Sequence, residues 1–366
     1  MKNNFNTDYH SSRERFRSEV FENKNHNKLP LRYVFILTNK CNLDCSFCFQ
    51  DRKRREGSLD YNDWLNLTNQ LPDYAHITLT GGEPLVFKNF DLIFKEIDKK
   101  YSSNIISNGL LLNEKFIDLF VNSKKLKVFS ISIDDIGNLN RDVKESQWKK
   151  LEANINLFKD KINENFKNSQ DLESNKLLID SKTVVLDQNA NSLFEIYKYL
   201  KLKLRIDTHS FQFLKGSPIQ HADFSFEYNK IFENSLAYEY KNFDSILEQL
   251  EKVREFNIEN NYSSFTHPKY IDLNSTISVY DQSYKYFNIT KHDQNNYKLC
   301  QAPWESMHIN VDGAVYPCLA VELGNIKKNT LNEIFFGQKY ELFKKDLIKN
   351  KTFQACNRCG YLRIHI

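Results

Sequence analysis

Short apolar segments alternate with amphipathic segments between residues 31 and 214, and this alternation limits the possible folds more than any other feature. In the amphipathic segments apolar residues recur every three or four positions. This pattern predicts helices over Tyr61–Leu71, Phe90–Lys99, Glu114–Val121, Gln147–Phe166 and Leu193–Leu200. The apolar segments predict strands over Arg32–Leu37, His76–Leu79, Asn104–Ser107, Val128–Ile133, Leu178–Val185 and Ile206–Leu214. Such alternation is typical of a parallel sheet with right-handed crossovers. The fold class is therefore α/β, and six units favour a curved, partial (β/α)6 barrel.

Three cysteines, Cys41, Cys45 and Cys48, follow the first predicted strand, with three and two residues between them. A loop with this spacing can wrap three corners of a [4Fe–4S] cluster, whose usual ligands are thiolates. Three ligands for four irons leave one iron open to bind a small molecule. Zinc is the alternative metal, but it usually takes four N or S ligands, and no fourth lies nearby in the sequence.

This loop resembles the signature loop of the radical S-adenosylmethionine (SAM) superfamily, which also follows the first strand. The resemblance implies that the open iron chelates the amino and carboxylate groups of SAM. It also implies that an electron from the cluster cleaves SAM, and that the resulting 5′-deoxyadenosyl radical takes a hydrogen atom from the substrate. Phe47, before the third cysteine, matches the aromatic position beside the SAM adenine.

The second predicted strand is followed by Gly81-Gly82-Glu83-Pro84. Ligands of parallel α/β sheets bind at the carboxyl ends of strands, and paired glycines let the backbone approach a ligand closely. The segment is similar to the GGEP motif of the superfamily, which holds the SAM amino group. Its position one strand after the cysteine loop strengthens the resemblance.

Two more strand ends carry small polar residues. Asn108 follows the third predicted strand, and Ser132 and Asp134 lie at the end of the fourth. By the same resemblance these three side chains bond the ribose or the carboxylate of SAM, whereas ordinary turn chemistry is the alternative. The superfamily commonly has Gly where Asp135 stands, which leaves the geometry of this turn open. No catalytic acid or base can be named from the sequence.

The remaining cysteines are Cys300, Cys318, Cys356 and Cys359. Twelve residues separate Cys300 from Gly313, and four more precede Cys318. This spacing, followed by Cys-x-x-Cys, resembles the SPASM/twitch extension of radical SAM enzymes. Because no cysteine follows Cys359, the match is to the shorter, twitch-like form with one auxiliary [4Fe–4S] cluster. Structural zinc bound by the same four thiolates remains the alternative.

The segments around these cysteines predict a small α+β domain. Two short apolar runs, Ser306–Val311 and Ala314–Cys318, are joined by Asp312-Gly313, which is typical of a hairpin whose turn has positive φ at both central residues. A helix is expected over Leu331–Ile348. The chain thus divides into a polar N-terminal arm (1–28), a radical SAM core (29–224), a connecting, mainly helical region (225–295, with helix over Phe226–Ile258) and an auxiliary-cluster domain (296–366).

Composition limits the location and the partners. The first twenty residues contain no apolar segment, and no stretch approaches the roughly 18 apolar residues that span a bilayer. A cytoplasmic location without membrane contact is expected, where seven cysteines favour metal over disulfides. The net charge of +4 and the single basic run Arg52-Lys53-Arg54-Arg55 fall short of a nucleic-acid-binding face. A nucleic acid partner is therefore not expected.

The cysteine count also indicates the type of reaction. Three plus four ligands use all seven cysteines, so no thiol remains to donate a hydrogen atom to a substrate radical. This favours a net oxidation, either a crosslink or a dehydrogenation, with the second cluster as electron relay and a flavodoxin or ferredoxin as external donor. The resemblance makes a ribosomally synthesised peptide the first choice of substrate. A small-molecule dehydrogenase and an RNA-modifying enzyme are the alternatives. Because the cysteine loop begins so early, a leader-peptide-binding partner is expected to be a separate protein.

Overall fold

The structure is a computed structural model that describes residues 15–22, 28–50, 59–168, 176–216, 227–233, 237–288, 292–318 and 321–365. The strands of this part form one sheet in the order β10-β9-β8-β1-β2-β3-β4-β5-β6-β7. Their bounds are β1 Arg32–Ile36, β2 His76–Thr80, β3 Ser102–Ser107, β4 Leu126–Ser132, β5 Leu178–Val185, β6 Thr208–Phe213, β7 Phe265–His267, β8 Ser306–Ile309, β9 Ala314–Tyr316 and β10 Gly324–Asn325.

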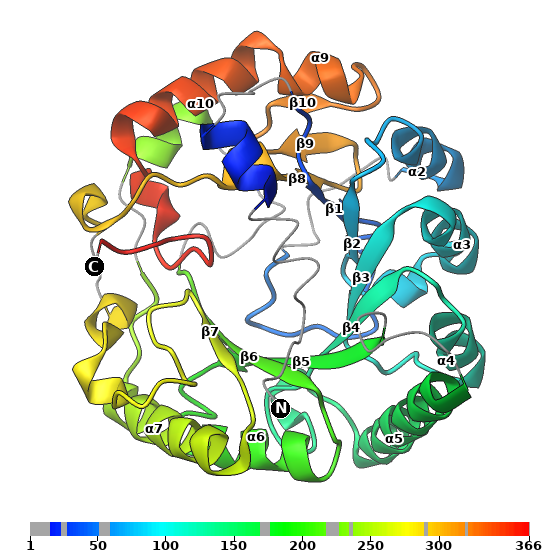
Figure 1. Cartoon of the computed structure of the whole chain (residues 1–366), viewed down its shortest axis with the longest axis vertical. Helices are drawn as coiled ribbons and strands as arrows, with labels where there is room; N and C mark the ends of the chain where they lie inside the picture. The colour runs from blue at the N-terminus through cyan, green and yellow to red at the C-terminus, as the bar shows by residue number, and fades with distance from the viewer. Residues whose placement is uncertain are drawn as a thin grey trace.

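Helices cover the convex side of the curved sheet (Figure 1). The α-helices in the described part of the chain are α2 Tyr61–Thr68, α3 Phe90–Lys100, α4 Glu114–Val121, α5 Glu145–Asn168, α6 Leu193–Leu202, α7 Phe243–Asn260, α8 Ala302–Glu305, α9 Leu331–Phe335 and α10 Gln338–Asn350. The short helices are η1 Ser18–Glu22, η2 Pro84–Val86, η3 Leu139–Arg141, η5 Tyr228–Phe232, η6 Val279–Asp281, η7 Tyr284–Asn288, η8 Gln294–Asn296 and η9 Gln354–Cys356. The predicted helices that alternate with the first six strands are all present, with ends shifted by a few residues.

The predicted parallel sheet and partial barrel are confirmed. Strands β1 to β6 pair in chain order, and every pair is parallel. The sheet is longer than predicted at both ends, because β7 pairs with β6 and β8 pairs with β1, both in parallel. Strand β7 was not predicted, because three residues are too few to show a periodicity. The sheet is curved, and its edge strands are β7 and β10, which do not pair with each other (Figure 1).

The two faces of the sheet differ in character. On the outer face, Phe35 packs against Trp64 of α2 with ring centroids 4.9 Å apart, and Phe129 packs between Phe120 and Phe158. The inner face carries polar residues instead, and half-buried Asn104 alternates with fully buried outward-facing residues along β3. The apolar core therefore lies between the sheet and its helices, whereas the inside of the barrel is polar.

The hairpin of residues 306–318 is confirmed, but its turn is not of the expected type. Strands β8 and β9 are antiparallel, and Gly313 N donates to Asn310 O at 2.9 Å. Asn310 N also donates to Ala314 O, so the turn is a type I turn closed by a glycine bulge. In this turn only Gly313 has positive φ, at 86°. The short β10 then continues the sheet beyond β9.

Two predicted helices are interrupted. The segment Leu331–Ile348 divides into α9 and α10 because Gly337 is extended, with φ −75° and ψ 160°. Helix α7 begins only at Phe243, although the prediction started it at residue 226. The backbone N–H groups of Lys241 and Asn242 both donate to Asp187 Oδ1, at 2.9 and 3.0 Å, and this bonding replaces a helical turn. Residue 226 itself and residues 234–236 lie outside the described residues.

The N-terminal arm is described in part. Residues 15–22 are helical, with Phe16 and Val20 buried in the core and Arg17 paired with buried Glu305, whereas residues 1–14 and 23–27 lie outside the described residues. The basic run at residues 52–55 also lies outside them. In the described part of the chain no helix combines the length and the apolar character needed to cross a membrane.

Candidate metal and cofactor site

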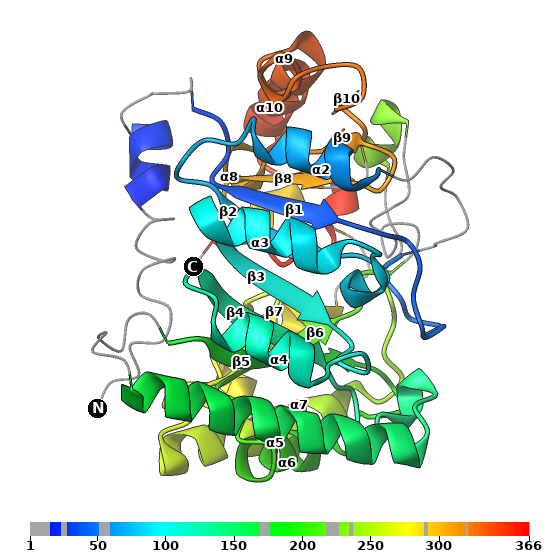
Figure 2. The ribbon, with the colours of Figure 1, turned by 90° about the vertical axis from the view of Figure 1, so that its right-hand side faces the viewer.

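The cysteine loop lies at the carboxyl ends of the parallel strands. In Figure 2 the strands point toward the side where this loop projects, and η1 lies at the other end. The loop is fixed to the sheet by hydrogen bonds from Gly82 N to Thr38 O at 2.7 Å and from Glu83 N to Lys40 O at 2.9 Å. The predicted GGEP-like turn and cysteine loop are therefore in direct contact.

The paired glycines are required by this contact. A Cβ atom on Gly81 would lie 2.6 Å from Thr38 O, and one on Gly82 would lie 2.4 Å from Lys40 O. Both distances are too short for any side chain. The glycines therefore let the backbone of the turn lie directly against the cysteine loop, and their predicted contact with a ligand stays a prediction.

The thiols of the loop receive polar hydrogens from several elements. Backbone N–H groups of Leu43 and Gln50 point at the sulfurs of Cys41 and Cys48, at 3.4 and 3.5 Å. Asn108, after β3, donates from Nδ2 to Asn42 Oδ1 at 2.8 Å and lies 3.8 Å from the Cys41 sulfur. The sequence prediction placed Asn108 beside SAM, and the structure places it beside the cysteine loop.

Arg141 joins the loop to the end of β4. Its Nη1 lies 3.8 Å from the Cys45 sulfur, its Nε lies 2.5 Å from Asp134 Oδ2, and its guanidinium lies 5.3 Å from the Phe47 ring centroid. Burial raises the pKa of the Cys45 thiol, and the Arg141 charge opposes this. Arg141 was not among the predicted site residues, because it lies well after the end of β4 and its sequence neighbours form no known motif.

The turn after β4 explains how Arg141 reaches the site. Asp135, at the position where the superfamily commonly has Gly, accepts hydrogen bonds from Leu139 N at 2.6 Å and Asn140 N at 2.8 Å. These bonds cap η3, which carries Arg141. Asp134 is fully buried and accepts from Val184 N at 2.7 Å, so its carboxylate is held from two sides. Half-buried Ser132 lies at the end of β4 beside them.

We expect Arg141→Gln to destabilise the protein by about 3–5 kcal/mol, because the Asp134 carboxylate would stay buried without its partner. The control is Arg205→Gln. Arg205 pairs with Asp160 at 2.8 Å, but these side chains are 43% and 57% exposed, against 12% and 0% for Arg141 and Asp134. The control should cost less than about 1 kcal/mol. Equal losses in urea unfolding would contradict the assignment.

Glu83 is completely buried and bridges β2 to β3. Its carboxylate accepts from Ser107 Oγ and Asn108 N, both at 2.8 Å, and from Leu85 N at 3.1 Å. Burial raises the pKa of Glu83 to about 7, and these bonds oppose the shift only in part. Pro84 follows as the first residue of η2 and is buried. Glu83 therefore supports the turn and the start of the Asn108 segment.

The raised pKa of Glu83 makes stability depend on pH. Because the folded protein keeps the proton to about pH 7 and the unfolded chain releases it near pH 4.5, the free energy of unfolding should fall as pH rises through this window. We expect a decrease on the order of 2 kcal/mol relative to Glu83→Gln. Urea unfolding at pH 4.5 and 8 measures this, with exposed Glu259→Gln as control. Parallel pH profiles for the parent and Glu83→Gln would contradict the shift.

The other four cysteines lie in the second half of the chain. Burial raises the pKa of Cys300 to about 12 and that of Cys356 well above its usual range. After burial, the nearby Cys359 thiol makes the largest contribution to both pKa shifts, so these three thiols are neighbours. Phe353 N points at the Cys356 sulfur at 3.3 Å. Cys318 follows β9 and acts electrostatically on Tyr340.

The donor chemistry fits metal at both places. All seven cysteines belong to the described part of the chain, and each is a free thiol. Buried thiols with raised pKa values become good ligands when a metal supplies positive charge, and N–H groups aimed at sulfur stabilise thiolates. The fit lies in the type of donor and not in a preformed geometry, because within the described ranges no three His, Cys, Asp or Glu side chains lie close enough together to hold a metal ion.

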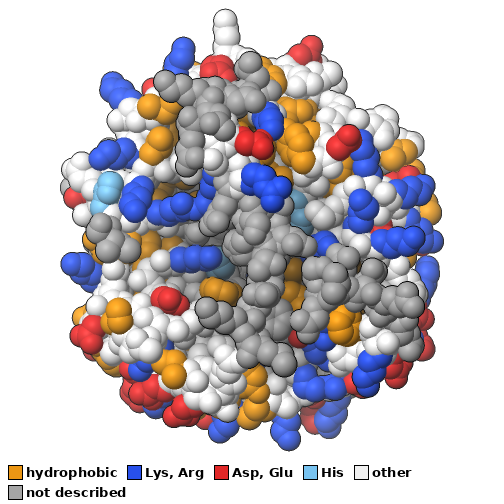
Figure 3. Space-filling model, in the orientation of Figure 1, with side chains coloured by type: hydrophobic (Ala, Val, Ile, Leu, Met, Phe, Trp, Pro, Cys, Tyr) orange, Lys and Arg blue, Asp and Glu red, His pale blue; other side chains and the backbone are white. Residues whose placement is uncertain are grey.

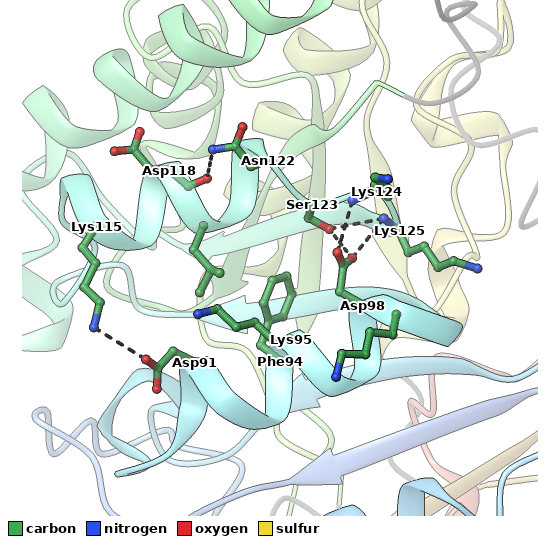
Figure 4. Close-up of a pocket in the computed structure, with 12 residues that line it drawn as sticks. Asp91, Phe94, Lys95, Asp98, Lys115, Asp118, Asn122, Ser123, Lys124 and Lys125 are labelled. Carbon is green, nitrogen blue, oxygen red and sulfur yellow. Dashed lines mark hydrogen bonds and ion pairs between the residues drawn. The ribbon is translucent and has the colours of Figure 1, made fainter.

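A separate pocket lies on the outer helix layer, between α3 and α4 (Figure 4). Its lining includes Phe94, Asp98 and an ion pair between Lys115 Nζ and Asp91 Oδ2 at 3.6 Å. Asp98 accepts from the backbone N–H of Lys125 at 3.0 Å. None of the predicted site residues lines this pocket, so we do not assign the site there.

Comparison with known proteins agrees with this geometry. The sequence model of the radical SAM superfamily matches residues 35–169, and that of the SPASM iron–sulfur cluster-binding domain matches residues 300–360. The uncharacterized protein MJ0907 of Methanocaldococcus jannaschii is 31% identical over 206 residues, which are 51% of this chain and 64% of that protein. The sporulation killing factor maturation protein SkfB of Bacillus subtilis is 33% identical over 114 residues, 30% of this chain and 28% of SkfB.

Among solved structures, SuiB of Streptococcus suis bound to its precursor peptide SuiA superposes with a TM-score of 0.59 at 16% identity. The match covers 95% of this chain and 74% of SuiB, and at this identity it shows the fold alone. The two matched domains imply an iron–sulfur cluster and SAM. Cys41, Cys45 and Cys48 lie in the first matched segment, and the other four cysteines lie in the second. The chain therefore contains a radical SAM domain at residues 35–169, followed by a SPASM iron–sulfur cluster-binding domain at residues 300–360.

Proposed function

We propose that the protein is a radical SAM enzyme that oxidatively modifies a peptide. A [4Fe–4S] cluster held by Cys41, Cys45 and Cys48 would supply the electron that cleaves SAM and generates the 5′-deoxyadenosyl radical. The observation that carries this proposal is the attachment of a three-cysteine loop to the GGEP-like turn at the carboxyl ends of a parallel barrel. Parallel sheets bind ligands at this end.

The residues around the loop have separate roles in holding SAM. Arg141 brings a positive charge next to Cys45 and Phe47, and is placed to pair with the SAM carboxylate. Phe47 offers a ring face for the adenine. Asp134 holds the Arg141 guanidinium in place, and Glu83 holds the segment that carries Asn108. The predicted contacts of Gly81, Gly82, Pro84 and Ser132 with SAM belong to the same proposal.

The peptide substrate is supported by the relatives. SkfB is named as a maturation protein for the sporulation killing factor, and SuiB was solved with its precursor peptide. This chain spans only 28% of SkfB and 64% of MJ0907. For this chain, the peptide, its crosslinking or dehydrogenation, and the need for an external electron donor and a leader-binding partner are therefore part of the proposal.

The auxiliary site is proposed to hold a second [4Fe–4S] cluster on Cys300, Cys318, Cys356 and Cys359. Three of these thiols are electrostatic neighbours, and Cys318 would complete the four ligands. A cluster with four thiolates has no open iron, so an electron relay is its natural role. With no other cysteine in the sequence to return a hydrogen atom, the substrate radical would lose an electron.

A net oxidation predicts that SAM is consumed and not regenerated. We expect about one 5′-deoxyadenosine for each modified peptide, in which the product has lost two hydrogen atoms. Liquid chromatography of the nucleoside and mass spectrometry of the peptide measure the ratio under anaerobic conditions with a chemical reductant. Since abortive cleavage can only raise the ratio, clearly less than one 5′-deoxyadenosine per product would contradict the oxidative mechanism. A product of unchanged mass would contradict it as well.

A further inference from the structure

The Cys-x-x-Cys segment near the C-terminus carries a buried arginine with unused hydrogen-bond donors. Arg358 lies between Cys356 and Cys359 and is only 2% exposed. Its Nη1 donates to the backbone carbonyl oxygens of Leu214, at 3.0 Å, and of Tyr238. Its Nε and Nη2 are buried and have no hydrogen-bond partner in the described part of the chain. Two of the three guanidinium nitrogens are therefore left without an acceptor.

The described groups around Arg358 supply no negative charge at neutral pH. Burial lowers the pKa of Arg358, but arginine stays protonated in proteins. The groups that act on it electrostatically are the hydroxyls of Tyr240, Tyr270 and Tyr238. Burial raises the pKa of each of these hydroxyls, so all three are neutral at neutral pH. Burying a charge without an opposite charge is costly, which indicates that the functional protein places an anion here.

Arg254 of α7 provides the comparison. Arg254 and Arg358 are the two buried arginines among the described residues. Arg254 donates from Nε and Nη2 to the two carboxylate oxygens of Glu251, at 3.0 and 2.7 Å. Other Lys and Arg side chains are spread over the molecular surface, where water solvates them (Figure 3). Arg358 has neither a carboxylate partner in the described chain nor access to water.

Asn357 adds a third unused donor to the same segment. It is 4% exposed, and its Nδ2 is buried without a partner among the described residues. The unpartnered side-chain nitrogens and oxygens of residues 356–359 are therefore all N–H donors. A group that satisfies them must accept hydrogen bonds, and Arg358 requires that it be negative. An iron–sulfur cluster with four thiolates has both properties, because its sulfurs accept hydrogen bonds and the thiolates make it anionic.

The donors lie where the ligands of the auxiliary cluster are proposed. Because consecutive Cα atoms are about 3.8 Å apart, the backbones of Asn357 and Arg358 directly adjoin those of Cys356 and Cys359. The Tyr270 hydroxyl is close enough to both the Cys359 thiol and the Arg358 guanidinium to be influenced by both. The buried positive charge and the unused donors are therefore part of the auxiliary site.

We propose that Arg358 and Asn357 stabilise the extra electron of the auxiliary cluster and so make this cluster an electron acceptor. Reduction adds one negative charge to the cluster, and a buried cation with N–H groups directed at sulfur favours the reduced form. The electron comes from the substrate radical, which also loses a proton, and it passes on to an external one-electron carrier protein. This inference rests on the proposed function, because it explains how the second cluster can take that electron.

The test measures the reduction potential of the second cluster alone. The full chain with the Cys41→Ala, Cys45→Ala and Cys48→Ala substitutions is reconstituted anaerobically, and electron paramagnetic resonance follows its reduction at controlled potentials. In Arg358→Gln the ratio of reduced to oxidised cluster at a fixed potential should fall at least about tenfold. This corresponds to a shift of about 59 mV to more negative potential for one electron. An unchanged potential in Arg358→Gln would overturn the proposal.

Further variants separate charge from folding. Arg358→Lys should keep most of the potential because the positive charge remains, and Asn357→Ala should lower it by less than Arg358→Gln does. Arg254→Gln is the matched control, since it also removes a buried arginine, and it should leave the potential unchanged. An equal shift in this control would overturn the assignment. If Arg358→Gln binds no cluster, Asn357→Ala decides, and an unchanged potential there would overturn the proposal.

Iron content, SAM cleavage and peptide mass, measured on the protein with all seven cysteines, distinguish this inference from the proposed function. A shifted potential without any peptide modification would support the role of Arg358 and contradict the peptide-modifying function. Modified peptides together with an unchanged potential would support the function and overturn the role of Arg358. Zinc in place of iron at the second site would overturn both this inference and the electron relay, whereas SAM cleavage at the first cluster would continue.

Discussion

Replacing Cys41, Cys45 and Cys48 together with alanine is expected to remove about four iron atoms per chain and to abolish reductive cleavage of SAM. The three thiols belong to one loop, and no other cysteine of the described chain is among the causes that shift the pKa of Cys45. Without them the loop keeps no thiolate ligand. Iron and zinc are counted after anaerobic reconstitution with iron and sulfide, and 5′-deoxyadenosine is measured after adding reductant.

The parent should contain about eight irons and the triple variant about four. Ser46→Ala, an exposed residue on the same loop, is the control and should behave like the parent. About four irons and one zinc in the parent would keep the radical SAM assignment but make the second site structural, and the electron relay would then be wrong. A parent without stable iron would contradict the proposed function.

Gly82→Ala is expected to have the second largest effect. The new Cβ would lie 2.4 Å from Lys40 O and 2.9 Å from Asn39 O, and backbone atoms cannot move away as a flexible side chain could. The cysteine loop would have to shift by roughly an ångström, and misplacement on that scale can cost about a hundredfold in rate. We expect a loss of this order in SAM cleavage and a lower iron content at the first site.

Gly360→Ala provides the matched control for Gly82→Ala. Its Cβ would meet nothing closer than His267 Nδ1 at 3.5 Å, an ordinary van der Waals contact, and its φ is not in the left-handed region. This variant should keep both the iron of the first site and SAM cleavage. If Gly82→Ala cleaves SAM as fast as Gly360→Ala does, the attachment of the loop through the GGEP-like turn is not needed.

Much of this arrangement could be predicted from the sequence because it depends on local patterns. Strand β5 and helix α4 were predicted with their correct ends, since each is a short segment with one clear periodicity. The neighbouring positions of the cysteine loop, the GGEP-like turn and the Asn108 turn follow from parallel strands that pair in chain order. All three segments lie within residues 35–169, which the radical SAM model matches.

What the sequence could not show depends on contacts between distant segments. Arg141 is marked by no motif, and its role comes from the cap that Asp135 provides and the burial of Asp134. The pairing of β8 with β1 joins residues that are far apart in the chain and leaves no local signal. The contact of the GGEP-like turn with the cysteine loop, which leaves no room for a Cβ on either glycine, likewise joins segments that are distant in the chain.

The position of β1 in the middle of the sheet has a consequence for how the chain folds. Arg32–Ile36 leaves the ribosome long before one of its two neighbours, Ser306–Ile309. Until then β1 presents an open edge, and open edges invite wrong pairing with other chains. Contacts between such distant segments also slow folding. The two matched domains are therefore expected to reach the native state together, because the edge of β1 is covered only when Ser306–Ile309 has paired with it.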